Sequence, residues 1–143
     1  MKHLLNKNNF VLLLVFCASM FYTAQASELQ GRWEITQASV LKISGSDTLT
    51  VNVDSVKNNP FFALYDTLIF EGNRLSLPVS GHLAQGEYSL TGNEIAFNFT
   101  AVAYVLKYRI ADEKLYLTQR TTISYLCSDC IYLVETVYKR VNL

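Results

Sequence analysis

Two cysteines, Cys127 and Cys130, form the sharpest chemical motif in the sequence, with one serine and one aspartate between them. In an oxidising compartment two such cysteines usually pair, and a disulfide here would staple the tip of a last hairpin with the cysteines facing each other across two strands. Redox exchange is the alternative, but it needs a thiol pKa lowered by a helix N-terminus or a cation. Because strand formers and the acidic Asp129 surround the pair, we predict a structural disulfide.

His82 is the only histidine outside the first 26 residues, and therefore the only candidate general base of its kind. It lies in a loop-like stretch, and the sequence contains no Gly-x-Ser-x-Gly nucleophile motif. A Ser-His-Asp triad assembled from distant positions stays open as an alternative. A zinc site built on Cys127, Cys130 and His82 lacks the fourth ligand that zinc normally takes. We therefore predict a protein with no catalytic residues, no metal and no cofactor.

Aromatic side chains recur at every second position of several stretches, the spacing that places them on one face of a strand. Tyrosine suits a ligand cavity because it combines an apolar ring with a hydroxyl that needs a partner. A place in a filled core is the alternative for each of these residues. The candidate ligand-binding residues are Tyr88, Phe97, Phe99, Tyr104, Tyr108 and Tyr132.

Short β-rich stretches separated by turn residues must position these side chains. The predicted strands cover residues 31–43, 49–53, 67–70, 75–79, 86–90, 94–99, 103–110, 115–126 and 130–141. Turn signals such as Glu71-Gly72-Asn73-Arg74 join neighbouring stretches as hairpins. Eight or nine strands at this spacing predict an all-β protein, an antiparallel up-and-down barrel with an open sandwich as the alternative.

Residues 55–65 break the strand pattern. Asn59 could cap a short helix that begins at Pro60. Such a helix would cover one end of a barrel. The alternative is a loop that tucks Phe61 and Phe62 into the core.

The N-terminal segment has the organisation of a secretory signal peptide. Lys2 and Lys7 precede an apolar run at residues 10–16, which is too short for a membrane span, and small residues lead to Ala24-Gln25-Ala26. We predict a signal peptide at residues 1–26 and one exported domain at residues 27–143, periplasmic or extracellular. Lipid anchoring through Cys17 is the alternative, although the large Phe16 precedes it.

The charge of the exported part argues against a nucleic-acid partner. Loss of Lys2 and Lys7 leaves ten basic and twelve acidic residues, a net charge of −2, and the cations are not clustered. No apolar run after residue 26 is long enough to cross a membrane as a helix.

Gly31-Arg32-Trp33 opens the first predicted strand and resembles the Gly-x-Trp signature of the lipocalins. In that family the tryptophan closes one barrel end and an arginine from a late strand packs over it, and Arg140 stands where that arginine is expected. The chain is also similar to short exported lipocalin-like, calycin-type domains common in Bacteroidota. The resemblance implies a barrel with one closed end and an interior that binds a small molecule.

These observations predict an exported, non-catalytic binding module for a small apolar or amphipathic ligand inside the barrel. The alternative is a protein-interaction module with a filled core, such as an inhibitor or an envelope-assembly component. Its binding face would include Ile131, Leu133 and Val137 on the last strand. An enzyme is the third class, and it would need His82 in a cleft beside an activated serine or carboxylate.

Overall fold

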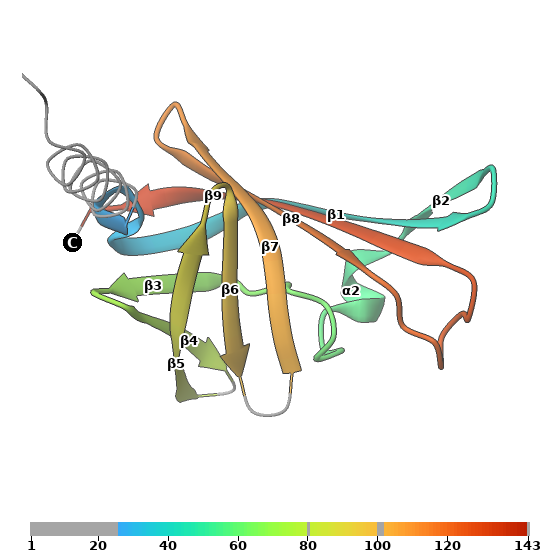
Figure 1. Cartoon of the computed structure of the whole chain (residues 1–143), viewed down its shortest axis with the longest axis horizontal. Coiled ribbons are helices and arrows are strands. Elements are labelled where there is room, and N and C mark those ends of the chain that lie inside the picture. Colours follow the sequence, from blue (N-terminus) through green and yellow to red (C-terminus); the bar gives the residue numbers. More distant parts are fainter. Residues whose placement is uncertain (1–25, 80, 100–101, 143) are drawn as a thin grey trace, which may run out of the picture.

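A computed structural model describes residues 26–79, 81–99 and 102–142 of the chain (Figure 1). Residues 26–29 are helical, and nine strands and one further short helix follow. The elements are β1 (Gly31–Ser44), β2 (Asp47–Val51), α2 (Val53–Val56), β3 (Thr67–Glu71), β4 (Arg74–Val79), β5 (His82–Thr91), β6 (Glu94–Phe99), β7 (Val102–Ala111), β8 (Lys114–Thr121) and β9 (Ile131–Val141). The predicted all-β, antiparallel class is confirmed.

Eight of the strands form a closed up-and-down barrel. Neighbours pair antiparallel in the order β1-β3-β4-β5-β6-β7-β8-β9, and β9 returns to pair with β1. The closing pair is in register from Arg32 opposite Val141 to Ile43 opposite Ile131. Because the sheet closes on itself, the open sandwich is excluded.

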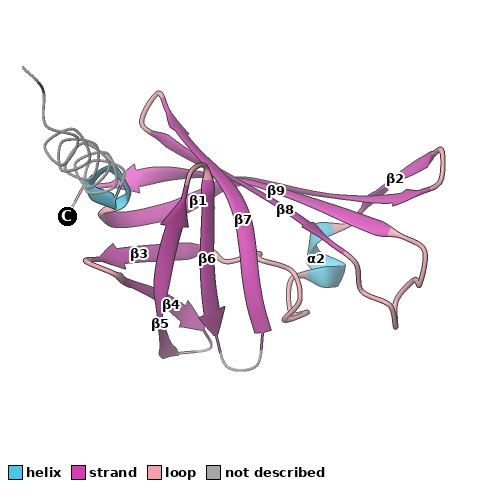
Figure 2. Ribbon diagram, viewed as in Figure 1, coloured by secondary structure: helices cyan, strands magenta, loops and turns pink. Residues whose placement is uncertain are grey.

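β1 is longer than the barrel is tall, and it carries β2 beyond the barrel. Its first residues pair with β3, its last residues pair with β2, and β9 runs along nearly its whole length. The register slips by one residue between Ile35 and Gln37, which is a β-bulge, and bulges bend a strand. Figure 2 shows the result, a long arm of β1, β2, β8 and β9 that projects from the barrel.

Alternating side chains separate the interior of the barrel from its surface. In β6, for example, Ile95, Phe97 and Phe99 are buried while Glu94 and Asn98 are exposed. The same alternation holds in β9 from Tyr132 to Tyr138. The period of two read from the sequence therefore assigns the faces of these strands correctly.

The apolar side chains form two separate clusters. The larger cluster fills the barrel around Trp33, Phe70, Phe97 and Tyr138. The smaller one lies under the arm, where Phe62, Ile123 and Tyr132 pack with Val40 and Val134. The loop between α2 and β3, residues 57–66, contributes side chains to both clusters and so connects the barrel to the arm.

Two local predictions are wrong. No helix begins at Pro60; helix α2 lies earlier, with Asn52 as its N-cap, and residues 57–66 form the loop that was the alternative. That loop buries Phe62 as the alternative predicts, but Phe61 stays 41% exposed. In that loop Asn59 accepts a hydrogen bond from the amide of Phe61, which turns the chain without a helix. The strand predicted to reach residue 126 ends at Thr121, and residues 122–130 form a loop.

The predicted signal peptide, the cleavage after Ala26 and the alternative anchor Cys17 fall on a segment of which only Ala26 is among the described residues. Within the described ranges, no helix has the length and apolar character needed to cross a membrane.

Candidate functional site

Trp33 is fully buried at one end of the barrel, which we call the closed end. Its indole N–H donates to the carbonyl of Leu29 at 2.8 Å, and the Arg140 guanidinium lies over its ring, 4.4 Å from the centroid. Arg140 also donates to the carbonyls of Glu28 and Gln30, so it ties the chain entering β1 to the end of β9. This is the arrangement that the lipocalin resemblance implies for these two residues.

Gly31 makes the close approach to Arg140 possible. Its φ is +113°, in the region that side chains disfavour, and an added Cβ would lie 3.3 Å from the guanidinium. Two physical features thus favour glycine at the first position of the Gly-x-Trp motif: its backbone conformation and the space that Arg140 occupies.

Aromatic rings fill the barrel above this closed end. The rings of Phe97 and Tyr104 stack with centroids 5.1 Å apart, and Phe70 meets Tyr88 edge-on at the same distance. The Tyr88 hydroxyl donates to the carbonyl of Gly72 and accepts from the amide of Gln30. Phe70, Tyr88 and Phe97 thus belong to the barrel core, whereas Tyr104 belongs to the core and also reaches the plug loop.

The loop of residues 57–66 enters the opposite, open end, and we call it the plug loop. Three side chains from inside the barrel hold its main chain: Tyr104 donates to the carbonyl of Pro60, Tyr138 donates to that of Tyr65 at 2.9 Å, and Gln119 binds twice. The Gln119 amide donates to the carbonyl of Phe61 at 2.9 Å, and its oxygen accepts from the N–H of Ala63 at 2.8 Å. The barrel interior therefore supplies partners for four main-chain groups of the plug loop, of which the Ala63 amide is buried.

The two tyrosines of this end stay neutral. Burial raises the pKa of Tyr138 above its usual range, and burial with the neighbouring Tyr104 hydroxyl does the same to the pKa of Tyr65. Neither hydroxyl can act as a phenolate base near neutral pH. Tyr138 acts instead as a hydrogen-bond donor to the plug loop.

A cavity of about 560 Å³ remains between the plug loop and the ends of four strands. One wall is the plug loop itself, from Lys57 to Asp66. The Lys57 ammonium and the Asp66 carboxylate form an ion pair with an N–O distance of 3.0 Å. The opposite wall comes from β4, β5, β6 and β7, whose open ends lie together at the lower side of Figure 1. The side chains of that wall are Leu77, Pro78, Val79, Ala84, Phe99, Val102 and Tyr104. The cavity is thus apolar on the barrel side, and its loop side combines polar side chains with the apolar Pro60, Phe62 and Leu64.

The structure brings only two of the six candidate ligand-binding residues to this cavity. Phe99 and Tyr104 line it. Tyr88 and Phe97 lie deeper in the barrel core, and Tyr108 lies toward the closed end, where its hydroxyl reaches the carbonyl of Gly92 at 3.5 Å.

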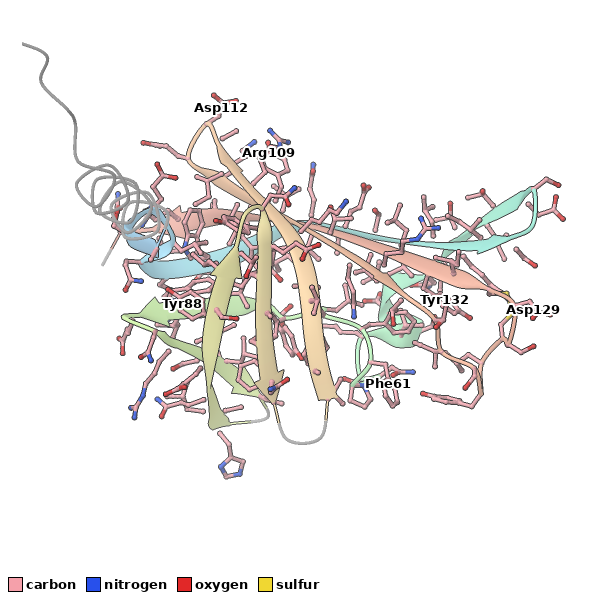
Figure 3. All side chains as sticks on the ribbon, viewed as in Figure 1. Phe61, Tyr88, Arg109, Asp112, Asp129 and Tyr132 are labelled. Carbon is pink, nitrogen blue, oxygen red and sulfur yellow. A yellow bond between two sulfur atoms is a disulfide. The ribbon has the colours of Figure 1, made fainter. Side chains whose placement is uncertain are left out.

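Tyr132 lies outside the barrel. Its ring meets that of Phe62 edge-on at 5.3 Å in the smaller cluster. Figure 3 shows it beneath the arm, on the other side of the molecule from Tyr88. Period-two parity places Tyr132 on the inner face of β9 correctly, but β9 extends past the barrel there.

Cys127 and Cys130 form a disulfide, as predicted, although in a different setting. Both lie in the loop of residues 122–130 rather than on facing strands. Cys130 is buried in the smaller cluster, and the same loop places Ile123 there. The disulfide therefore constrains the loop that packs on the smaller cluster.

His82 is exposed at the start of β5, and no hydrogen bond joins it to a serine or carboxylate among the described residues. In that part of the chain no three His, Cys, Asp or Glu side chains gather as metal ligands. The predicted interaction face is also less open than expected, because Ile131, Leu133 and Val137 are half-buried between β1 and β8.

Of the three residues that hold the plug loop, the sequence analysis named Tyr104 and missed Gln119 and Tyr138. The type of residue at position 119 does not indicate that it points inward, and nothing local indicates that Tyr138 contacts Tyr65, 73 positions away. The available signal was parity, because Gln119 is two residues from Leu117 and four from Leu115, both buried. Neither a scan against protein-family models nor a search of curated proteins finds a match to this chain.

Proposed function

We propose that this chain is a non-catalytic binding protein that holds a small apolar or amphipathic molecule at the open end of a lipocalin-like barrel. The observation that carries the proposal is the cavity of about 560 Å³ between the plug loop and the strand ends. Small-molecule sites are typically concave, mostly apolar and of about 300–1,000 Å³. The cavity has that size, and its apolar barrel wall faces a loop that carries both apolar side chains and the polar Lys57, Asn58 and Asp66.

The chemistry of the lining supports an amphipathic ligand. Leu77, Phe99 and Val102 offer apolar contact, and burial of apolar surface contributes about 25 cal/mol per Å². Asn58 brings an amide group to the loop side, where a ligand's polar end would lie. The neutral Tyr65 hydroxyl adds a further hydrogen-bonding group on this side.

Export to the periplasm or beyond the cell is part of the proposal, with lipid anchoring through Cys17 as its alternative. The signal-like residues 1–26 motivate it. The disulfide between Cys127 and Cys130 supports it, because disulfides persist in oxidising compartments.

Binding of N-phenyl-1-naphthylamine, a neutral apolar dye that fluoresces in apolar surroundings, tests the proposed site. Ala84 lines the cavity and Ala103 lies on the outer face of β7, so Ala84→Phe places a ring in the cavity and Ala103→Phe is the matched control. We expect saturable binding to the wild type and to Ala103→Phe, and at least about a tenfold loss in Ala84→Phe. Equal binding by all three proteins would refute the assignment of the cavity.

A protein-interaction module is the second candidate, favoured by exposed apolar side chains near the open end. Phe61 and Tyr125 contact each other edge-on at 5.9 Å while both stay exposed, and Leu126 and Leu83 are exposed as well. Figure 3 shows Phe61 at the end of the molecule where β7 begins. Two results together would favour this candidate over the first: the wild type binds no dye, and a protein that copurifies with the wild type is lost in the Phe61→Ser variant.

A further inference from the structure

The outer edge of β2 is a free edge of the sheet. The barrel closes on itself, but β2 lies outside it and pairs with β1 alone. Figure 1 shows β2 at the far end of the arm, with no described segment beyond it. A free edge exposes main-chain N–H and C=O groups that another strand can bind.

The register of the β1–β2 hairpin identifies these groups. Ser44 pairs with Asp47 across the two-residue turn, and in such a turn the closing pair exchanges two hydrogen bonds. Hydrogen-bonded and non-bonded pairs alternate along an antiparallel ladder, so Leu49 and Val51 also bond to β1. Thr48 and Thr50 therefore direct their N–H and C=O groups away from β1.

β2 lacks most of the features by which proteins protect an edge. It contains no lysine, proline or bulge, and Thr48, Thr50 and Val51 are β-branched residues that favour strands. Its one charge, Asp47, lies at the end beside the turn. In the middle stands Leu49, a large apolar side chain that is 64% exposed.

We propose that two copies of this chain pair through β2, antiparallel, about a two-fold axis at Leu49. Thr48 of each copy then lies opposite Thr50 of the other, and the outward N–H and C=O groups of both residues form four main-chain hydrogen bonds. The two Leu49 side chains meet on the axis. Leu49 shares a face with Val51, which packs on the smaller cluster, so the pair continues apolar packing from one copy to the other.

A second copy fits this edge better than a flexible peptide does. Four hydrogen bonds are few, and a disordered peptide would lose conformational entropy when it formed them. A second copy arrives with its β1–β2 hairpin already formed and with Leu49 in place. The formal net charge of the chain is zero, or −2 without residues 1–26, so repulsion between copies is small.

Sedimentation equilibrium tests the proposal. The sample is the protein that the host releases after expression of the full sequence, N-terminal segment included. We expect a concentration-dependent dimer. Thr50→Pro removes only an outward N–H, and it should raise the dimer dissociation constant at least about tenfold, because the axis repeats the lost bond. Thr50→Val keeps that N–H and is the matched control, so it should dimerise like the wild type.

Two further variants keep the test independent of the proline. Leu49→Lys places two ammonium groups on the axis and should abolish the dimer. Leu49→Cys should cross-link the copies on oxidation, because directly opposite residues of a non-bonded pair approach to about 4.5 Å between Cα atoms, whereas Thr48→Cys should not. A wild type that stays monomeric to about 1 mM, or a dimer that survives both Thr50→Pro and Leu49→Lys, would overturn the proposal.

Discussion

Replacing Gln119 with leucine removes the contact that fixes the middle of the plug loop in the barrel. Leucine keeps the approximate size of the side chain but leaves the N–H of Ala63 and the carbonyl of Phe61 without their partner. A buried main-chain group without a partner costs about 1–3 kcal/mol. Ala63 is buried and pays this cost, whereas Phe61 is 41% exposed and water can reach its carbonyl more easily. We therefore expect the free energy of unfolding to fall by about 1–3 kcal/mol, most of it from the amide of Ala63.

Urea unfolding measures this loss, and hydrogen exchange at the amide of Ala63 shows whether the plug loop has been released. Gln85 is exposed on β5, so Gln85→Leu is the matched control and should change stability by less than about 0.5 kcal/mol. A loss below about 0.5 kcal/mol in Gln119→Leu, with Ala63 still protected from exchange, would show that the plug loop is held by something else.

Three more predictions concern the closed end, the buried hydroxyl and the cavity wall. Arg140→Ala should lower the free energy of unfolding by about 2–3 kcal/mol and shift the fluorescence emission of Trp33, the only tryptophan, to the red, because the ring and two carbonyls lose the guanidinium. Arg74→Ala, at an exposed site, should do neither, and equal effects of the two substitutions would contradict the contact of Arg140 with Trp33. Since the pKa of Tyr138 is raised in the folded state, the contribution of the Tyr138 hydroxyl to stability is complete below about pH 10 and falls by about 1.4 kcal/mol per pH unit above pH 10. Urea unfolding midpoints measured from pH 9 to 11 should show this fall in the wild type and a smaller fall in Tyr138→Phe. Gly86→Ala should destabilise by about 1–3 kcal/mol and weaken dye binding, because the new Cβ would lie 2.6 Å from the carbonyl of Asn98 and 3.4 Å from Phe99; unchanged urea unfolding would refute the close contact.

The parts of the fold that sequence could predict are those set by local pattern. Alternation along β6 and β9 identified their buried faces, and turn residues located the hairpins, so the barrel followed from strand count and spacing. Trp33 and Arg140 were expected to meet, and β1 and β9 place them directly opposite each other in the register. These features depend on the period of the chain and on one short motif.

The parts that sequence could not predict depend on where a long strand leaves the barrel. Parity assigned Tyr132 to an inner face, but nothing local indicates that the barrel ends before it and a second cluster begins. Strand formers around Ile123 and Tyr125 extended the predicted β8 too far, because the disulfide and the cluster override their propensity. Half of the cavity wall is the plug loop, whose position depends on Gln119, Tyr104 and Tyr138 from distant strands.

The most direct test of the central claim is native mass spectrometry of the protein from a host that exports it, with the denaturing mass of the same sample. We expect extra mass in the native spectrum that disappears on denaturation, and that is absent from Ala84→Phe but present in Ala103→Phe, since only the first substitution places a ring in the cavity. Native and denaturing masses that agree for the wild type, together with no saturable dye binding, would contradict a ligand site at the open end of the barrel.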